Sequence, residues 1–208
     1  MAELILDETA SISTPASGKA SIYASSDTNQ MLIRAKADTG VDLPLSAINN
    51  WSVASQSPAA ATRTYITGSK IAVPVGKLQV GTMFRWKFNM TKTAAGIAAS
   101  TFDIAVGTLG TTGDTARVSF TKPAGTAAID EAWVEITAIV RTIGVTGVMV
   151  GEFVLNHNLA ATGHAVIPNV CVNTISAGFD MTVGNLMVGI CITSGAADAI
   201  TIQMILVE

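Results

Sequence analysis

Two histidines are the residues whose type best fits metal chemistry in this chain. His157 stands in FVLNHNLA, and His164 follows seven residues later in ATGHAV. Zinc takes about three or four protein ligands, mostly His, Cys or carboxylate, and no third ligand stands at a plausible spacing from this pair. We therefore predict no metal site. His157 is expected at a strand end, with its ring bonded to backbone or to a neighbouring loop, and His164 in a loop.

Cysteine chemistry is equally limited. Cys171 and Cys191 are the only cysteines, they stand twenty residues apart, and neither belongs to a CxxC pair. Each lies in an apolar stretch, so two buried, reduced thiols are predicted. A disulfide between neighbouring strands stays open, because sequence spacing does not decide it.

The residues of hydrolytic enzymes are present, but not in a catalytic pattern. Serine nucleophiles often stand in a GxSxG turn between a strand and a helix, and neither Gly68-Ser69 nor Ala177-Gly178 has this form. Glycosidases hold two acids across a cleft, and no spacing here selects a pair. The acids considered, for which solvated or turn-capping positions are predicted, are Asp103, Asp114, Asp130, Glu131, Glu135, Glu152 and Asp180. We predict that the chain is not an enzyme.

Two further motifs could bind ligands. Residues 92–96, KTAAG, lack the GxxxxGK[ST] order of a phosphate-binding loop, so a turn is predicted there and no cofactor. Trp51, Trp86 and Trp133 could stack on a sugar through their rings. Trp86 falls in phase with an apolar face, so core packing is the preferred interpretation for it.

The elements expected to position these residues are strands. Residues 82–90, TMFRWKFNM, place Phe84, Trp86, Phe88 and Met90 on one face and polar side chains on the other. Similar alternation predicts a hairpin of residues 101–107 and 115–121, with Ala116, Val118 and Phe120 inward in its second strand. Further strands are predicted at residues 133–141, 148–156, 178–183, 185–193 and 199–207. No helical periodicity of ten residues or more is present.

The first part of the chain predicts a smaller unit. Residues 19–24 and 31–37 are expected to pair across a turn at 25–30. Residues 47–62 lack alternation and contain Pro58, so a connection is predicted there, with the boundary near residue 60. The fold class is therefore all-β: an extended hairpin segment and linker at 1–60, and an antiparallel, jelly-roll-like β-sandwich at 61–208. An immunoglobulin-like topology is the alternative, although its Cys…Trp…Cys spacing is absent.

Composition limits the partners. Apolar residues make up 49% of the 208 residues and charged ones only 13%, the net charge is −3, and mean hydropathy is +0.47. No run of about 20 apolar residues could span a membrane, no basic stripe matches a row of phosphates, and residues 1–10 carry three acids rather than the basic start of a secretory signal. We expect no nucleic-acid binding and no membrane insertion. Contact with other subunits best accounts for so few charges.

Two stretches resemble phage virion proteins. Residues 14–19, TPASGK, lead into SIYASSDTNQMLIRAKADTG, which is similar to the TPxxGxxxxYxxxDgxLyxkxxxG pattern near the N-termini of phage fibre and head or tail accessory proteins. Residues 78–120, LQVGTMFRWKFNMTKTAAGIAASTFDIAVGTLGTTGDTARVSF, resemble a β-rich C-terminal domain of phage structural proteins. The first match departs from the pattern at Asn29-Gln30-Met31, which replaces the usual glycine-bearing turn.

The resemblance implies a virion structural protein, assembled in the host cytoplasm, without catalytic residues. The preferred function is that of a capsid decoration (cement) protein that binds the major capsid protein or another virion protein, as a homotrimer. The alternative is a tail or head fibre protein that binds a host-surface receptor such as a glycan. An esterase or hydrolase on a sandwich scaffold is the third hypothesis, and the missing catalytic pattern disfavours it.

Overall fold

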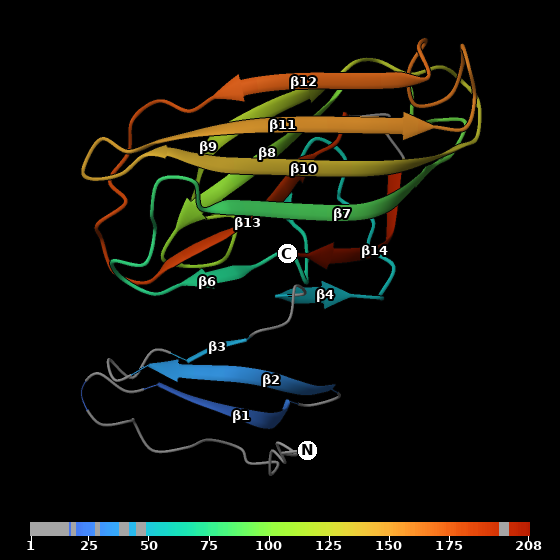
Figure 1. Cartoon of the computed structure of the whole chain (residues 1–208). Coiled ribbons are helices and arrows are strands. Elements are labelled where there is room, and N and C mark those ends of the chain that lie inside the picture. The colour runs from blue at the N-terminus through green and yellow to red at the C-terminus, as the bar shows by residue number, and fades with distance from the viewer. Residues whose placement is uncertain (1–16, 18–19, 28–29, 38–41, 45–48, 196–199) are drawn as a thin grey trace. The chain divides into compact units, whose positions relative to one another are not determined.

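The computed structural model describes residues 17, 20–27, 30–37, 42–44, 49–195 and 200–208. Every regular element within these residues is a β-strand (Figure 1). The chain divides into two compact units, Met1–Asn49 and Asn50–Glu208. The division precedes the boundary predicted near residue 60, because β4 (Asn50–Ser52) already pairs with the last strand of the second unit.

The first unit contains a three-stranded antiparallel sheet in the order β1-β2-β3. Its strands are β1 (Ala20–Asp27), β2 (Gln30–Ala37) and β3 (Asp42–Pro44). The predicted pairing of residues 19–24 with 31–37 is confirmed, with strands longer than expected, since Ala20 pairs with Ala37 and Asp27 with Gln30. Of the TPASGK motif, only Ser17 lies within the described residues.

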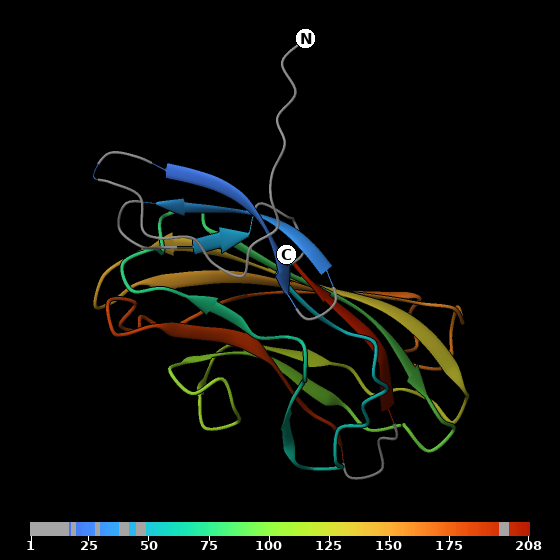
Figure 2. The ribbon, with the colours of Figure 1, turned by 90° about the horizontal axis from the view of Figure 1, so that it is seen from below.

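The second unit is an antiparallel β-sandwich, as predicted, and Figures 1 and 2 show its two sheets as layers. The larger sheet has the order β12-β11-β10-β7-β14-β4. Its long strands are β7 (Met83–Lys92), β10 (Asp130–Thr142), β11 (Val148–His157), β12 (Asn169–Ile175) and β14 (Ile200–Val207). The smaller sheet contains β5 (Arg63–Tyr65), β13 (Leu186–Thr193), β8 (Ser100–Gly107) and β9 (Thr115–Lys122), and β6 (Ile71–Val73) also pairs with β13.

Strands far apart in sequence pair in a nested way. Within the second unit, the first long strand, β7, pairs with the last, β14. The second long strand, β8, pairs with the second to last, β13. Between them β10 and β11 form a hairpin. The edges of the two sheets also meet, since Thr174 of β12 donates a hydrogen bond to the Ser119 carbonyl of β9 at 3.1 Å. The nested pairing of β7 with β14 and of β8 with β13 is the jelly-roll-like feature of the fold.

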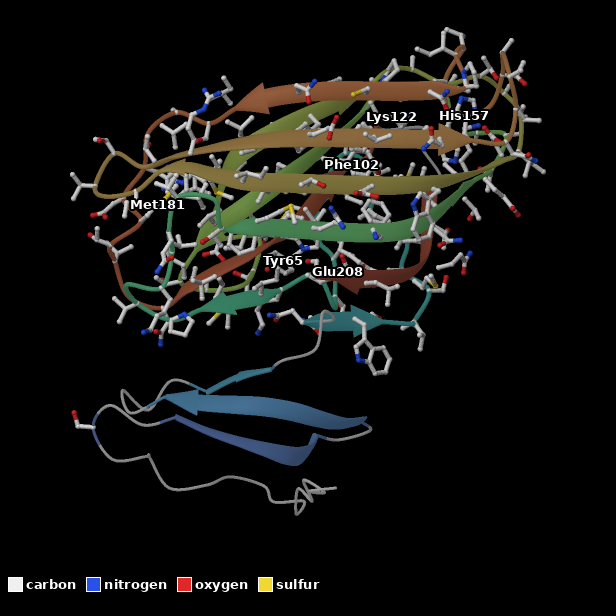
Figure 3. The ribbon with its side chains drawn as sticks, in the orientation of Figure 1. Tyr65, Phe102, Lys122, His157, Met181 and Glu208 are labelled. Carbon is white, nitrogen blue, oxygen red and sulfur yellow. The ribbon has the colours of Figure 1, made fainter. Side chains whose placement is uncertain are left out.

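Alternating side chains fill the space between the sheets. Phe88, Phe102, Phe153 and Phe120 come from four strands in both sheets and form a continuous series with ring centroids 6.2, 4.9 and 6.0 Å apart. All four rings are fully buried, and Figure 3 shows Phe102 between the layers. Burial of one such side chain contributes about 1.5–3 kcal/mol to folding, so this series is the centre of the core.

Three strand predictions were wrong. Ala116 is exposed rather than buried, because a bulge puts Ala105 opposite Ala116 and Ile104 opposite Val118 and so shifts the alternation. Residues 178–183 form one isolated bridge, Gly147 to Phe179, and no strand. Residues 47–62 are not only a connection, since β4 lies within them.

Candidate interaction surface

The larger sheet carries a row of apolar side chains on its outer face. Strand pairing aligns Met83 with Ile139, Ile139 with Val150, and Val150 with Ile175. Met83, Ile139 and Ile175 are 49%, 43% and 56% exposed, and Val150 is half-buried. We call these four residues the apolar row. Because directly paired residues lie about 4.5–5.5 Å apart, the row is one continuous strip across four strands.

More apolar surface adjoins the row at the same end of the sandwich, where β10 turns into β11 (Figure 1). Val80, 64% exposed, shares a shallow hollow of about 400 Å³ with Ile139 and Val150. The turn itself exposes Ile143 and Val145. Contiguous exposed apolar patches larger than a few hundred Å² are rare on monomers, and such patches mark contact sites.

The strand positions next to the apolar row on this outer face carry charged, salt-bridged side chains. Arg85 contacts Glu135 at 3.2 Å and Glu208 at 3.4 Å, and Lys87 lies 3.8 Å from Glu208. These groups are partly exposed, and such pairs contribute about 0–1 kcal/mol each. The acid Glu135, for which a solvated or turn-capping position was predicted, lies in this partly exposed salt-bridge network. The contrast with the neighbouring polar rows makes the apolar row a distinct patch.

A buried polar cluster closes the opposite end of the sandwich. Asp130, at the start of β10, accepts hydrogen bonds from the backbone N–H groups of Glu131 and His164, both at 2.9 Å. Its carboxylate also lies 2.6 Å from Nδ1 of His157, at the end of β11. The remaining ring nitrogen of His157, Nε2, lies 2.6 Å from the Ile167 carbonyl. The predicted strand-end position of His157 is thus confirmed, with Asp130 as a partner that the sequence did not select.

Two buried lysines complete this end, and Figure 3 shows Lys122 and His157 toward the same end, opposite Met181. The Lys122 ammonium donates to the carbonyls of Pro123 and His164, at 2.9 and 3.0 Å. The Lys92 ammonium donates to three carbonyls of neighbouring loops. The Lys92 ammonium is therefore engaged by backbone carbonyls. The turn predicted after Lys92 is confirmed by the hydrogen bond from the Gly96 N–H to the Thr93 carbonyl.

His164 lies in a loop, as predicted, but its ring is fully buried. Neither ring nitrogen has a hydrogen-bond partner among the described residues. Burial, and next the positive charge of Lys122, lower the pKa of His164 from 6.5 to about 4. For Asp130 burial acts in the opposite direction, but the hydrogen bonds from His164, Glu131 and His157 outweigh it and lower its pKa.

These shifts predict a pH dependence of stability. Unfolding restores the ordinary pKa of His164, so the unfolded chain binds this proton first as the pH falls. The free energy of unfolding should decrease between pH 6.5 and pH 4, by on the order of 3 kcal/mol. The stabilising contribution of Asp130 is lost only at lower pH. Urea titrations at several pH values test this, with His164→Leu as the control that should remove most of the slope in that interval; an unchanged slope would contradict it.

A second ionic contact fixes a loop of the smaller sheet. Arg63 binds the buried Asp103 carboxylate through two nitrogens, Nη2 at 2.5 Å and Nε at 3.0 Å. Its Nη1 donates to the Thr112 and Asp114 carbonyls. The Asp114 carboxylate in turn accepts the N–H groups of Leu109 and Gly110. Asp103 and Asp114 are therefore committed to structural contacts.

The remaining acids lie apart. Glu131 is exposed, Glu152 contacts Cys171, and Asp180 accepts bonds from Thr182 in a turn. The described residues contain no group of three or more His, Cys, Asp or Glu side chains that could hold a metal ion. No helix among them is long and apolar enough to cross a membrane.

Both cysteines are free, and only one is buried. Cys191 lies on β13, and burial, with the nearby Asp103 charge, raises the pKa of its thiol to about 12. Cys171 is exposed, contrary to the prediction. The reason is its place on β12, where Val170 faces the core and Cys171 faces out beside Val154.

The three tryptophans have different positions. Trp86 is fully buried, and its Nε1 donates to the Ser69 carbonyl at 2.7 Å, so the predicted core role is confirmed. Trp51 and Trp133 are half-buried. They do not form a common platform, since Trp51 pairs with Leu206 at one edge of the larger sheet and Trp133 pairs with Asn89 and Asn156 in its middle.

No family model matches the chain, and no curated protein matches its sequence. Among solved structures, a legume lectin-like domain from Entamoeba histolytica is similar at 8% identity, over 76% of this chain and 89% of that chain, with a TM-score of 0.23.

Proposed function

We propose that this chain is a structural subunit of a phage virion, and specifically a decoration protein whose apolar row contacts both other copies of this chain and the assembled head. The apolar row carries the proposal, because its three most exposed members leave about half of each side chain in water. The low charge content and the resemblance to virion proteins support it. A homotrimer is the assembly we predict.

The proposed mechanism is mass action. A protein that binds only the assembled shell stabilises that shell by its binding free energy. Apolar surface covered at the contact supplies about 25 cal/mol per Å² before the cost of association. Such a subunit needs a rigid scaffold and an exposed apolar contact, and it needs no catalytic group.

The second candidate function is that of a fibre protein that binds a host-surface glycan. The observation in its favour is a hollow lined by Trp51 and Tyr65, away from the apolar row. Both functions use the sandwich as a binding module, but they place the subunit at different positions in the virion.

Electron microscopy of phage particles tests the two functions together. Particles that lack the chain are mixed with the purified protein, and its density is located. The decoration function predicts saturable density on the head, and heads that open at a higher temperature than untreated ones. Density confined to the tail tip would favour the fibre function, and no binding to any particle would contradict both.

A further inference from the structure

A hollow of about 380 Å³ lies along one side of the sandwich. Its walls come from β4, an edge strand of the larger sheet, from β5, at the edge of the smaller one, and from the loops that follow β5 and β8. The lining residues are Asn50, Trp51, Tyr65, Thr67, Gly68, Lys70 and Gly110. This volume is near the lower end of the range for ligand sites, about 300–1,000 Å³.

The walls are held in place before any ligand binds. The Asn50 amide donates to the Lys70 carbonyl at 2.7 Å and accepts the Trp51 N–H at 2.8 Å. The Gln56 side chain bonds both backbone groups of Thr67, at 2.7 and 2.9 Å. A preformed site loses less conformational entropy when it binds a ligand.

Two glycines keep the walls close together. Gly68 has φ +83°, and a Cβ there would stand 2.6 Å from the Cβ of Ser52. Gly110 has φ +66°, and a Cβ there would stand 2.7 Å from Cδ of Lys70. The Lys70 side chain therefore packs over Gly110. Larger residues would strain the backbone at both positions.

The chemistry of the lining combines flat apolar rings with unengaged polar groups. Tyr65 contributes its ring, since its Oη is closed off from solvent, and Trp51 contributes a half-buried indole. The Lys70 ammonium and the Thr67 hydroxyl are exposed, and no partner for either exists among the residues that the structure describes. Burial raises the pKa of Tyr65 to about 12, so its phenol stays neutral.

We infer that this hollow binds one pyranose ring of a saccharide. The negative face of an aromatic ring attracts the partly positive C–H groups on one face of a pyranose. Lys70 and Thr67 then bond the hydroxyl or carboxylate oxygens at the rim of the sugar. The biological use of this sugar site depends on the second proposed function, whereas the site itself is argued from the geometry of the hollow. The hollow and the apolar row share no residue, so the binding of sugar and the binding of a shell can fail separately.

Saturation-transfer NMR with the full chain tests the inference. The probes are glucose, galactose, N-acetylglucosamine and glucuronic acid, with open-chain sorbitol as the comparison. We expect transfer to the ring C–H protons of at least one pyranose and none to sorbitol. Transfer to no pyranose at about 50 mM, which lies beyond millimolar affinities, would overturn the inference.

Variants locate the binding. Trp51→Ala should weaken binding by at least about tenfold, Trp51→Phe should restore part of it, and Lys70→Met should weaken it without affecting the fold, since Lys70 is exposed. The matched control is Trp133→Ala, which removes another half-buried indole outside the hollow and should leave the affinity unchanged. Equal loss in Trp51→Ala and Trp133→Ala, or no loss in Lys70→Met, would contradict this site even if sugar binds. The oligomeric state should stay unchanged in all four variants.

Discussion

Replacing Asp130 with alanine is expected to lower the free energy of unfolding by about 3–5 kcal/mol. The carboxylate is buried and binds one ring nitrogen and two backbone N–H groups. Its removal leaves those donors without a partner inside the protein, where each loses its hydrogen bond and regains no water. The measurement is urea denaturation followed by tryptophan fluorescence at neutral pH.

Two companion variants make this result specific. Asp130→Asn keeps one carbonyl acceptor and should lose less stability, which provides a measurement if the alanine variant does not fold. Glu131→Ala changes an exposed acid next to it in β10 and should alter stability by less than about 0.5 kcal/mol. Equal stabilities of Asp130→Ala and Glu131→Ala would show that the polar cluster does not hold this end of the sandwich together.

Replacing Ile139 with lysine is expected to raise the dissociation constant of the proposed homotrimer by at least about 100-fold. Ile139 lies within the apolar row, paired with Met83 on one side and Val150 on the other. An ammonium group there loses water when a partner covers it, and no anion compensates for that loss. Because the side chain is 43% exposed, the fold should tolerate the change.

Val53→Lys is the matched control for that experiment. Val53 is 73% exposed and lies outside the apolar row, so the same kind of substitution should leave assembly intact. Sedimentation velocity over a concentration series compares both variants with the unchanged chain. Equal dissociation of both would show a general effect of charge, and no effect of Ile139→Lys would remove the apolar row from the contact.

The sequence predicted the strands whose alternation is strong and whose length is ordinary. Phe84, Trp86, Phe88 and Met90 placed β7 correctly, because four large apolar side chains in alternate positions have one natural arrangement in a half-buried sheet. It missed β12, an edge strand whose outward residues include two asparagines and whose inward ones are few. Three-residue strands such as β5 and β6 are too short to carry a period.

The sites depended on pairing, which the sequence does not state. Met83, Ile139, Val150 and Ile175 are single outward apolar residues in four separate strands, and only the register aligns them. The contact of Asp130 with His157 likewise depends on β10 pairing with β11, since the two residues are 27 positions apart. Each residue type was visible in the sequence, but its partner was not.

The mass of the unchanged chain in solution tests the central claim most directly. Light scattering at micromolar concentration should give a multiple of the 21.4 kDa of one chain, and the trimer that we propose corresponds to three times that value. The mass should fall toward one chain only on strong dilution. A stable particle of 21.4 kDa across the whole concentration range would contradict the claim that the apolar row is covered by other copies of this chain.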